Sequence, residues 1–352
     1  MSSSRILVRA TNWVGDAVMS LPALRALRAA YPGAHIALLA KPWVAGLYAR
    51  EHFADEVIPY PATTLPDKLR FARSLRRQAF DTAILLQNAF EAALIARLAG
   101  IPHRIGYNRD ARGWLLTNPV RPPKSGEIPP HQRFYYLELL RRAGIVDKLL
   151  PSDAIRLDGA DSARHEGLAL LRARGFEGPI IGLSPGAAFG TAKRWLPERF
   201  ADAAVRISRL RSASVAIFGS ASERPLCETV AALLAAEDIP CHNYAGETSL
   251  ADYINLAAAC DVYLTNDSGS MHIASALGVP TVAIFGATDA DATGPTGSLA
   301  RIVREPVDCS PCLLRTCPID HRCMKRVEAG RVADVALELM GQPNGAAKRL
   351  ES

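Results

Sequence analysis

The chain has 352 residues, 49% of them hydrophobic and 22% charged, which is the composition of a globular protein with room for two domains. This composition excludes a disordered chain, a collagen-like repeat and a small disulfide-stapled scaffold. No run of about 18 uncharged apolar residues occurs, because Glu91 and Arg97 interrupt the richest stretch, residues 89–100. Asp16 falls where a signal peptide would need its apolar core. We therefore expect a soluble, cytosolic protein.

The two halves of the chain differ in charge. Residues 1–175 contain 25 Lys and Arg against 15 Asp and Glu, whereas residues 176–352 contain 16 against 20. The basic first half predicts an anionic partner, for which nucleic acid, an acidic membrane surface and a phosphorylated lipid are candidates. Aromatic residues are not interleaved with the basic ones as in a single-strand nucleic-acid platform, so we expect no nucleic-acid partner.

Short apolar runs alternate with amphipathic stretches in the first half. Residues 6–10, 36–40 and 82–86 have the hydrophobic pattern of buried strands, and residues 17–30 and 68–78 have helical periodicity. A Pro-rich basic stretch at 118–132 predicts an extended loop, since helical periodicity resumes at Phe134.

The second half begins the same alternation again. Its predicted strands are residues 180–184, 215–218, 261–265 and 281–285, and its predicted helices are residues 198–210, 223–236, 250–259 and 270–277. Strands separated by helices of this length are typical of βαβ units and parallel sheets. We therefore predict an α/β protein of two Rossmann-like domains facing across a cleft, with ligands at the carboxyl ends of the strands.

The domain boundaries follow from this alternation. We place the first domain at residues 1–172 and the second at 178–341, with the option that the last helix packs back on the first domain. The short polar segment 342–352 is expected to fray.

The first predicted strand leads into Thr11-Asn-Trp-Val-Gly-Asp16 and then a helix. Asp16 is either a general base for an incoming hydroxyl or a first-turn acid that stabilises the helix dipole. The loop lacks the G-x-G-x-x-G pattern, which argues against a dinucleotide cofactor and an oxidoreductase.

Small and polar residues follow several predicted strands of the second half. Ser184-Pro-Gly-Ala187 leads through Thr191 to Lys193, a pattern that lets backbone N–H groups and a lysine approach a phosphate. Asp267-Ser268-Gly269 opens a helix that carries His272, and Glu223 follows another strand. Glu223 could accept hydrogen bonds from ribose hydroxyls. The structural alternatives are that Ser268 caps the helix, that His272 packs beneath it, and that Glu223 is a first-turn acid.

Four of the seven cysteines lie close together, at positions 309, 312, 317 and 323. Disulfides are disfavoured in a cytosolic chain. The first spacing of Cys309, Cys312, Cys317 and Cys323 fits a structural zinc ion, whereas the later spacings do not match a standard finger. Reduced thiols are the alternative.

A basic stripe at helical spacing contains Arg70, Arg73, Arg76 and Arg77, and Arg104 and Arg109 extend the positive surface. The stripe is either a solvated helix face or a contact for anionic headgroups and acidic sugars.

Four segments together resemble glycosyltransferase family 9 over nearly the whole chain: RILVRATNWVGD at 5–16, LPAL at 21–24, KRW at 193–195, and Asp267-Ser-Gly269 with His272. The resemblance implies a GT-B fold and an inverting mechanism that requires no metal or other cofactor. Within the family, the Trp-Val-Gly-Asp form and the cysteine-rich stretch are most similar to heptosyltransferases of the lipopolysaccharide inner core.

This resemblance implies transfer of L-glycero-D-manno-heptose from ADP-heptose to the first heptose of heptose-Kdo2-lipid A, at the cytoplasmic face of the inner membrane. Carried over by position, Asp16 is the catalytic base. The nucleotide-sugar residues would be Thr191, Lys193, Glu223, Asp267, Ser268, Gly269 and His272. The acceptor would contact Arg70, Arg73, Arg104 and Arg109. Heptosyltransferase I, or another core sugar transferase of the family, is the alternative activity. A non-catalytic protein that binds anionic lipid is the alternative of a different class.

Overall fold

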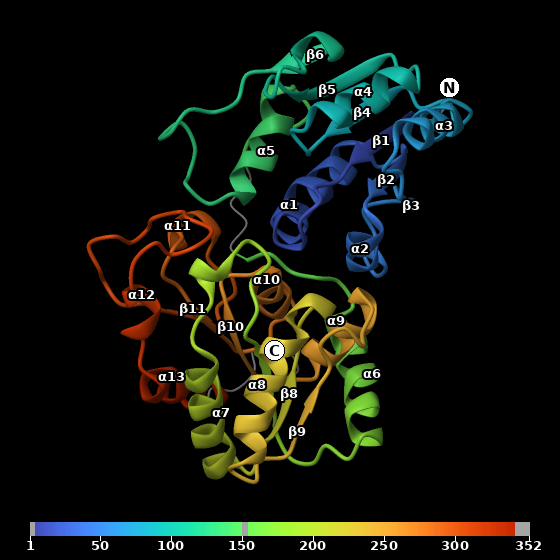
Figure 1. Cartoon of the computed structure of the whole chain (residues 1–352). Helices are drawn as coiled ribbons and strands as arrows, with labels where there is room; N and C mark the ends of the chain where they lie inside the picture. Colours follow the sequence, from blue (N-terminus) through green and yellow to red (C-terminus); the bar gives the residue numbers. More distant parts are fainter. Residues whose placement is uncertain (1–3, 150–153, 342–352) are drawn as a thin grey trace, which may run out of the picture. The chain divides into compact units, whose positions relative to one another are not determined.

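The computed structural model describes residues 4–149 and 154–341, and the chain separates into two compact units, 1–158 and 159–352. Each unit is a parallel β-sheet with helices on its faces (Figure 1). This confirms the predicted α/β class and the two parallel sheets.

The first unit alternates strands and helices from its start. Its strands are β1 (Arg5–Arg9), β2 (His35–Ala40), β3 (Glu56–Pro59), β4 (Thr82–Leu85), β5 (His103–Tyr107) and β6 (Asn118–Val120). Its helices are α1 (Val14–Ala30), α2 (Pro42–Ala45), α3 (Leu65–Arg76), α4 (Phe90–Leu98) and α5 (Arg133–Arg142), with 3-10 turns at η1 (Gly46–Tyr48) and η2 (Gly113–Leu115).

The second unit repeats this plan. Its strands are β7 (Ile180–Ser184), β8 (Ser214–Ile217), β9 (Cys241–Asn243), β10 (Val262–Asn266), β11 (Thr281–Ile284) and β12 (Ala300–Val303). Its helices are α6 (Ala160–Ala173), α7 (Pro197–Arg211), α8 (Arg224–Ala235), α9 (Leu250–Ala258), α10 (Gly269–Ala276), α11 (Ala290–Thr293), α12 (Arg322–Lys325) and α13 (Ala329–Gly341), with 3-10 turns at η3 (Thr191–Lys193) and η4 (Ala221–Glu223).

Both sheets have the same strand order. The first runs β3-β2-β1-β4-β5-β6 and the second β12-β11-β10-β7-β8-β9, with all pairs parallel. In each sheet the order reverses between the first and fourth strands of the unit, which are β1 and β4 or β7 and β10. Open α/β sheets bind ligands at this switch point, outside the carboxyl ends of the strands. The fold thereby marks one candidate ligand edge in each unit.

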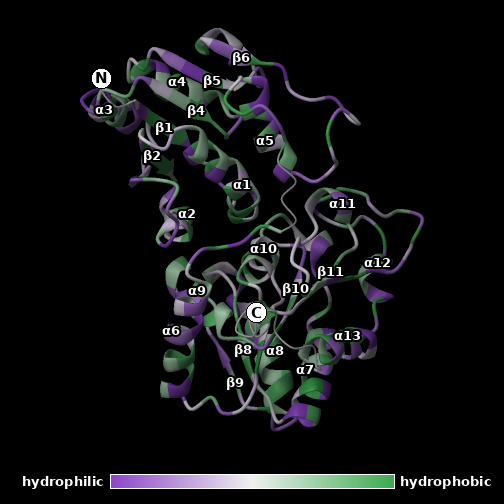
Figure 2. Ribbon diagram, turned by 180° about the vertical axis from the view of Figure 1, so that it is seen from behind, coloured by the Kyte–Doolittle hydropathy of each residue, from purple (hydrophilic) through white to green (hydrophobic). Residues whose placement is uncertain are grey.

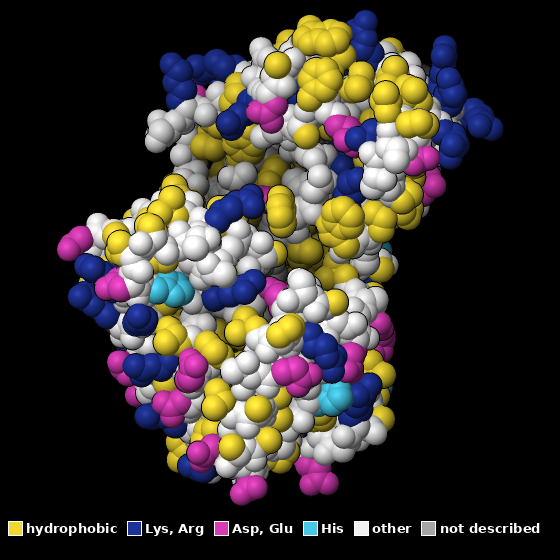
Figure 3. All heavy atoms as spheres, in the orientation of Figure 1, with side chains coloured by type: hydrophobic (Ala, Val, Ile, Leu, Met, Phe, Trp, Pro, Cys, Tyr) yellow, Lys and Arg dark blue, Asp and Glu magenta, His cyan; other side chains and the backbone are white. Residues whose placement is uncertain are grey.

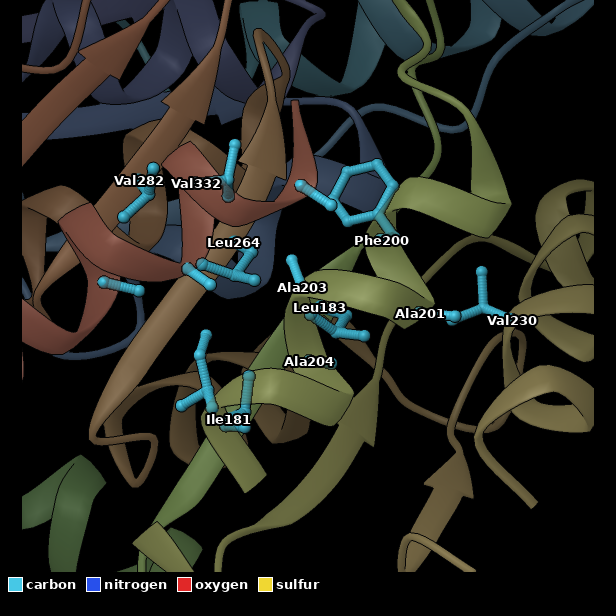
Figure 4. Packing of buried hydrophobic residues seen from close by; sticks show 14 of the residues in the cluster. Ile181, Leu183, Phe200, Ala201, Ala203, Ala204, Val230, Leu264, Val282 and Val332 are labelled. Carbon is cyan, nitrogen blue, oxygen red and sulfur yellow. The ribbon is translucent and has the colours of Figure 1, made fainter. Parts of the chain in front are cut away.

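The core of the second unit explains why its helices form where they do. Strands β7, β10 and β11 contribute buried Ile181, Leu183, Leu264 and Val282, which α7 and α13 cover with Phe200, Ala203, Ala204 and Val332 (Figure 4). The alanines on α7 let that helix approach the sheet closely. Helices α6 and α7 carry both hydrophilic and hydrophobic residues along their length (Figure 2), as expected for helices with one buried face.

The boundary between the units differs from the predicted one. Helix α6 lies before residue 173 yet belongs to the second unit, because it packs along α9. At Gly167 a β-carbon would lie 1.9 Å from the backbone oxygen of Asn255, so the two helices approach too closely for any side chain there. Arg164 also pairs with Asp261 at 2.9 Å. The division therefore falls after Asp158, and the prediction of residue 172 was wrong.

The last described helix contributes to the core of its own unit. Ala333, Ala336 and Leu339 of α13 are buried in the second unit's cluster, and α13 packs on α7, β10 and β11. Helix α13 therefore belongs to the core of the second unit, and the option that the last helix also packs back on the first domain stays a prediction. The segment 342–352, for which we predicted fraying, lies outside the described residues.

Candidate active site

Asp16 occupies the first turn of α1, directly after the loop that follows β1 at the switch point of the first unit. Its Oδ1 accepts a hydrogen bond from the hydroxyl of Tyr136 at 2.9 Å. Tyr136 lies on α5 and is 3% exposed. Burial, and then the negative charge of Asp16, raises the pKa of Tyr136 well above its usual value, so the phenol remains a donor to the carboxylate. The sequence did not indicate this partner.

The switch point of the second unit contains an ion pair. Lys193 Nζ lies 2.7 Å from Asp267 Oδ2, and both side chains are largely buried, at 13% and 4% exposure. The hydroxyl of Thr288, after β11, donates to the same carboxylate oxygen at 2.5 Å. Three segments that are distant in sequence therefore meet at one edge of the sheet, and the structure brings Lys193 and Asp267 together as predicted neighbours.

Asn266 holds the two loops of this switch point together. Its Nδ2 donates to the carbonyls of Pro185 and Gly186 at 2.7 and 3.2 Å, and its Oδ1 accepts from the backbone N–H of Trp195 at 2.9 Å. The side chain is completely buried. It thus fixes the loop after β7 and the segment that carries Lys193 relative to β10. Sequence reasoning missed Asn266 because it lies at the end of an apolar strand, directly before the motif.

The N-terminus of α10 is not capped by the side chain of Ser268. The N-cap Ser268 makes no side-chain hydrogen bond to the helix, and its hydroxyl lies 3.2 Å from that of Thr265. The structural alternative for Ser268 is therefore wrong. The first N–H groups of a helix carry the positive end of its dipole and are the usual binding site for phosphate.

Glu223 has the structural role that the sequence offered as an alternative. Its Oε2 accepts from the backbone N–H and the hydroxyl of Ser220 at 2.9 and 2.8 Å, which completes a capping box. Its other oxygen lies against Gly186, where a β-carbon would come within 2.1 Å of Oε1. Glu223 thereby spans the loops after β7 and β8, next to the switch point.

The two remaining predicted nucleotide residues differ in exposure. Thr191 is exposed at the start of η3, two residues before Lys193. His272 is buried at 5% exposure in the first turns of α10. Burial fits the alternative that His272 packs beneath the helix, and its contact with a ligand stays a prediction.

The predicted acceptor arginines fall into two groups. Arg70 and Arg73 on α3 and Arg109 after β5 are exposed, and Lys and Arg side chains protrude where α3 lies (Figure 3). Arg104 instead donates to the backbone carbonyls of Leu115, at 2.7 Å, and of Ile101. These bonds tie β5 to η2 and give Arg104 a structural role, and its contact with the acceptor stays a prediction.

Three of the four clustered cysteines lie on one loop of the second unit, between β12 and α12, and Cys323 lies in α12 itself. Within residues 4–149 and 154–341, no three His, Cys, Asp or Glu side chains converge to hold a metal ion. Cys309 is exposed, Cys323 is buried, and the nearby His321 lies 3.0 Å from the carbonyl of Ala192. The structural zinc ion that the first spacing favoured therefore stays a prediction.

The loop that carries these cysteines packs on the candidate nucleotide edge. The backbone N–H of Ala192 donates to the carbonyl of Arg315 at 3.0 Å, and that of Leu313 donates to Ala287 at 2.7 Å. At Gly190 a β-carbon would lie 2.2 Å from the Arg315 oxygen. The loop therefore contacts both the turn before Lys193 and the segment after β11, which is a function the sequence did not indicate.

Comparison with known proteins agrees with this arrangement. The model of glycosyltransferase family 9 (heptosyltransferase) matches residues 68–322. The chain is 36% identical over 310 residues to lipopolysaccharide heptosyltransferase 2 of Salmonella typhimurium, covering 85% of this chain and 88% of that protein. The chain belongs to glycosyltransferase family 9.

Two further proteins to which this chain is similar are also heptosyltransferases. Lipooligosaccharide heptosyltransferase 2 of Haemophilus influenzae is 34% identical over 313 residues, covering 85% of this chain and 88% of that protein. The solved structure of E. coli ADP-heptose lps heptosyltransferase II superposes with a TM-score of 0.81 at 33% identity, covering 96% of this chain and 98% of that one. The predicted family, the GT-B architecture of this glycosyltransferase and its enzyme class are thereby confirmed.

One further expectation concerns the membrane. In the part of the chain that the structure describes, no helix combines the length and apolarity needed to cross a bilayer.

Proposed function

We propose that this family 9 glycosyltransferase moves L-glycero-D-manno-heptose from ADP-heptose to the first heptose of the lipopolysaccharide inner core. The observation that carries the proposal is the switch point of the second unit, where Lys193, Asp267 and the uncapped start of α10 gather at adjacent strand ends. The names of the relatives supply ADP-heptose and lipopolysaccharide, and the first heptose as the acceptor sugar is what the family resemblance implies.

The donor site would act on the leaving group. Departure of ADP leaves negative charge on the β-phosphate, and Lys193 with the first N–H groups of α10 would stabilise that charge, each donor contributing about 3 kcal/mol. Asp267 and Thr288 hold the lysine in place. Thr191 would add a hydroxyl at the phosphates, Glu223 would approach the nucleoside, and His272 would support the turn.

Asp16 would act on the acceptor. The acceptor hydroxyl oxygen forms the new bond to the anomeric carbon as the bond from that carbon to the β-phosphate oxygen breaks. The hydroxyl proton passes to the Asp16 carboxylate, and ADP carries away the bonding electron pair, with inversion at the anomeric carbon. General base catalysis of this kind contributes typically ~10²–10⁴-fold. No step in this scheme uses a metal ion.

The acceptor is a lipid, so we propose peripheral contact with the cytoplasmic face of the inner membrane. The support is a surface of the first unit with exposed Arg70 and Arg73 on α3, and exposed Trp114 packed against Phe90 at 6.1 Å between ring centroids. Sedimentation with vesicles containing anionic lipid should recover the protein at low salt, and neutral vesicles should not. Equal recovery with both would contradict this contact.

The transfer itself is tested by incubating the protein with ADP-heptose and purified heptose-Kdo2-lipid A while ADP release and product mass are followed. We expect ADP release that depends on the acceptor, and a product heavier by one heptose. Kdo2-lipid A in place of that acceptor should give little product. If Kdo2-lipid A were the better acceptor, the activity would be that of heptosyltransferase I instead.

A further inference from the structure

Three cations and one carboxylate lie together at the carboxyl edge of the first sheet, outside the residues discussed above. Arg9 ends β1, Lys41 follows β2, Lys68 lies on α3, and Glu91 is in the first turn of α4 (Figure 1). Tyr60, directly after β3, lies among them. The elements concerned are neighbours in the sheet order β3-β2-β1-β4.

The carboxylate of Glu91 already interacts with other side chains of the cluster. Lys68 Nζ contacts Glu91 Oε2 at 2.8 Å, and the hydroxyl of Tyr60 donates to Oε1 at 2.7 Å. The pair of Lys68 and Glu91 is therefore neutral overall, and both carboxylate oxygens have partners.

The other two cations contact neutral groups. The guanidinium of Arg9 donates to the carbonyl of Ala10 at 2.7 Å and to Asn12 Oδ1 at 2.8 Å, and Arg9 is 4% exposed. Lys41 Nζ lies 4.3 Å from the centre of the Tyr60 ring and 3.5 Å from a backbone carbonyl. Burial, and then the charge of Arg9, lowers the pKa of Lys41. The positive charges of Arg9 and Lys41 thus lie close together, and Glu91 acts on them through electrostatic attraction over a longer distance.

An aromatic ring lies beside this charge. Trp43 is 59% exposed although its indole N–H donates to the carbonyl of Asn12 at 3.0 Å. Lys41 Nζ lies 5.7 Å from the centre of the same ring. Asn12 belongs to the loop that leads to Asp16, so the exposed indole is fixed to the loop that would hold the base. An indole face of this kind offers a flat apolar surface for a sugar ring.

We propose that Arg9, Lys41 and the exposed face of Trp43 form a subsite for an acidic group of the acceptor saccharide, either a sugar-acid carboxylate or a phosphate. This proposal rests on the proposed function. It adds the class of chemical group by which these residues would recognise the acceptor. Glu91 is paired with Lys68 and does not neutralise the positive charges of Arg9 and Lys41. An anion bound at Lys41 would neutralise them, and the indole of Trp43 would pack against the sugar ring that bears this anion.

The test uses calorimetry to measure binding of the oligosaccharide obtained by deacylating heptose-Kdo2-lipid A. One sample keeps its phosphates, and a second sample is dephosphorylated. Lys41→Met should weaken binding about tenfold, Lys41→Arg should retain most of it, and Trp43→Ala should also weaken it. Lys148→Met, at an exposed lysine of the same unit, is the matched control and should change nothing. Thermal unfolding of each variant shows whether it is folded. If Lys41→Met is not folded, the binding affinities of Lys41→Arg and Trp43→Ala test the subsite.

The two oligosaccharides distinguish the acidic group. An equal loss with both assigns the subsite to a carboxylate, and a loss only with the phosphorylated form assigns it to a phosphate. Wild-type affinity in Lys41→Met, or no binding by the wild type, would overturn the subsite.

Heptose transfer by the same variants separates the subsite from the proposed function. An active Lys41→Met enzyme with an unchanged KM for the acceptor would remove the subsite and leave the activity. Weakened binding in Lys41→Met without transfer by the wild type would remove the activity and leave the subsite.

Discussion

Tyr136 donates its hydroxyl to Asp16 at 2.9 Å, which links the first turn of α1 to the buried face of α5. The bond fixes one oxygen of the proposed base and leaves the carboxylate only half-buried. A base that is oriented before the substrate arrives loses less entropy in the transition state. If Asp16 is the base, as we propose, helix α5 takes part in orienting it, although none of its residues belongs to a recognisable motif.

Tyr136→Phe should lower turnover about tenfold, the effect of one hydrogen bond to a charged group. A carboxylate that has lost a donor is protonated more easily, so the acidic limb of the pH–rate profile should move to higher pH. Rates measured across that limb test both effects. Tyr135→Phe, whose hydroxyl instead accepts from Asn88, is the control and should leave the limb in place. An unmoved limb in Tyr136→Phe would show that the bond does not tune the base.

Lys193→Met should reduce kcat/KM for ADP-heptose about 10²-fold, because it removes a positive charge from the departing diphosphate. The stabilisation of the protein by ADP in thermal unfolding should shrink as well. Asp267 keeps its hydrogen bond from Thr288, so the fold should survive. Lys325→Met, at an exposed lysine of the same unit, should behave as wild type. Normal turnover and a normal ADP shift in Lys193→Met would exclude the lysine from the site.

Gly190→Ala tests the packing of the cysteine-bearing loop on the turn before Lys193. The new methyl group would meet the backbone oxygen of Arg315, so either the turn or the loop must shift. We expect a weaker ADP affinity, measured by calorimetry, and a lower melting temperature. Gly33→Ala, at a position with open space around it, should change neither. A wild-type ADP affinity in Gly190→Ala would mean that the loop does not position Lys193.

Glu138→Gln should destabilise the first unit by about 3 kcal/mol, because it leaves two arginines beside a neutral buried group. Glu138 on α5 pairs with Arg141 and Arg142 at 2.7 and 2.5 Å and is buried. Calorimetric unfolding at neutral pH measures the loss. The control is Glu237→Gln, in the exposed pair with Arg209, which should cost less than about 1 kcal/mol.

The same carboxylate gives the stability a pH dependence with a definite sign. The hydrogen bond from Arg141 lowers the pKa of Glu138 below its usual value of 4.5. Its contribution is therefore complete above that value and is lost as the pH falls through the lowered pKa. Glu138→Gln should remove this acid-dependent part of the unfolding curve. A variant whose stability declines with acid exactly as steeply as wild type would contradict the assignment.

Much of the fold could be predicted because the central strands are continuous apolar runs. Strands β3, β5, β6, β9 and β12 were not predicted. All but β5 lie at sheet edges, all five are partly exposed, and β6 contains Pro119. An edge strand buries little surface, so its sequence need not be hydrophobic, and proline is tolerated there. The domain boundary was missed because Gly167 signals the packing of α6 only once its neighbour is known.

The candidate site divides in the same way. Lys193 and Asp267 could be predicted because glycines and small residues mark the loops at strand ends. Asn266 and Tyr136 could not, since each acts through a partner more than 70 residues away. Arg104 illustrates a role that charge alone does not reveal: its side chain donates a hydrogen bond to the backbone carbonyl of Leu115.

The central claim, that Asp16 is the base of a heptosyl transfer supported by an ADP site in the second unit, is tested most directly with Asp16→Asn. Single-turnover product formation and ADP binding are measured on the same preparation. We predict at least a hundredfold slower transfer with nearly unchanged ADP affinity. Transfer at the wild-type rate would remove Asp16 from the mechanism and contradict the account.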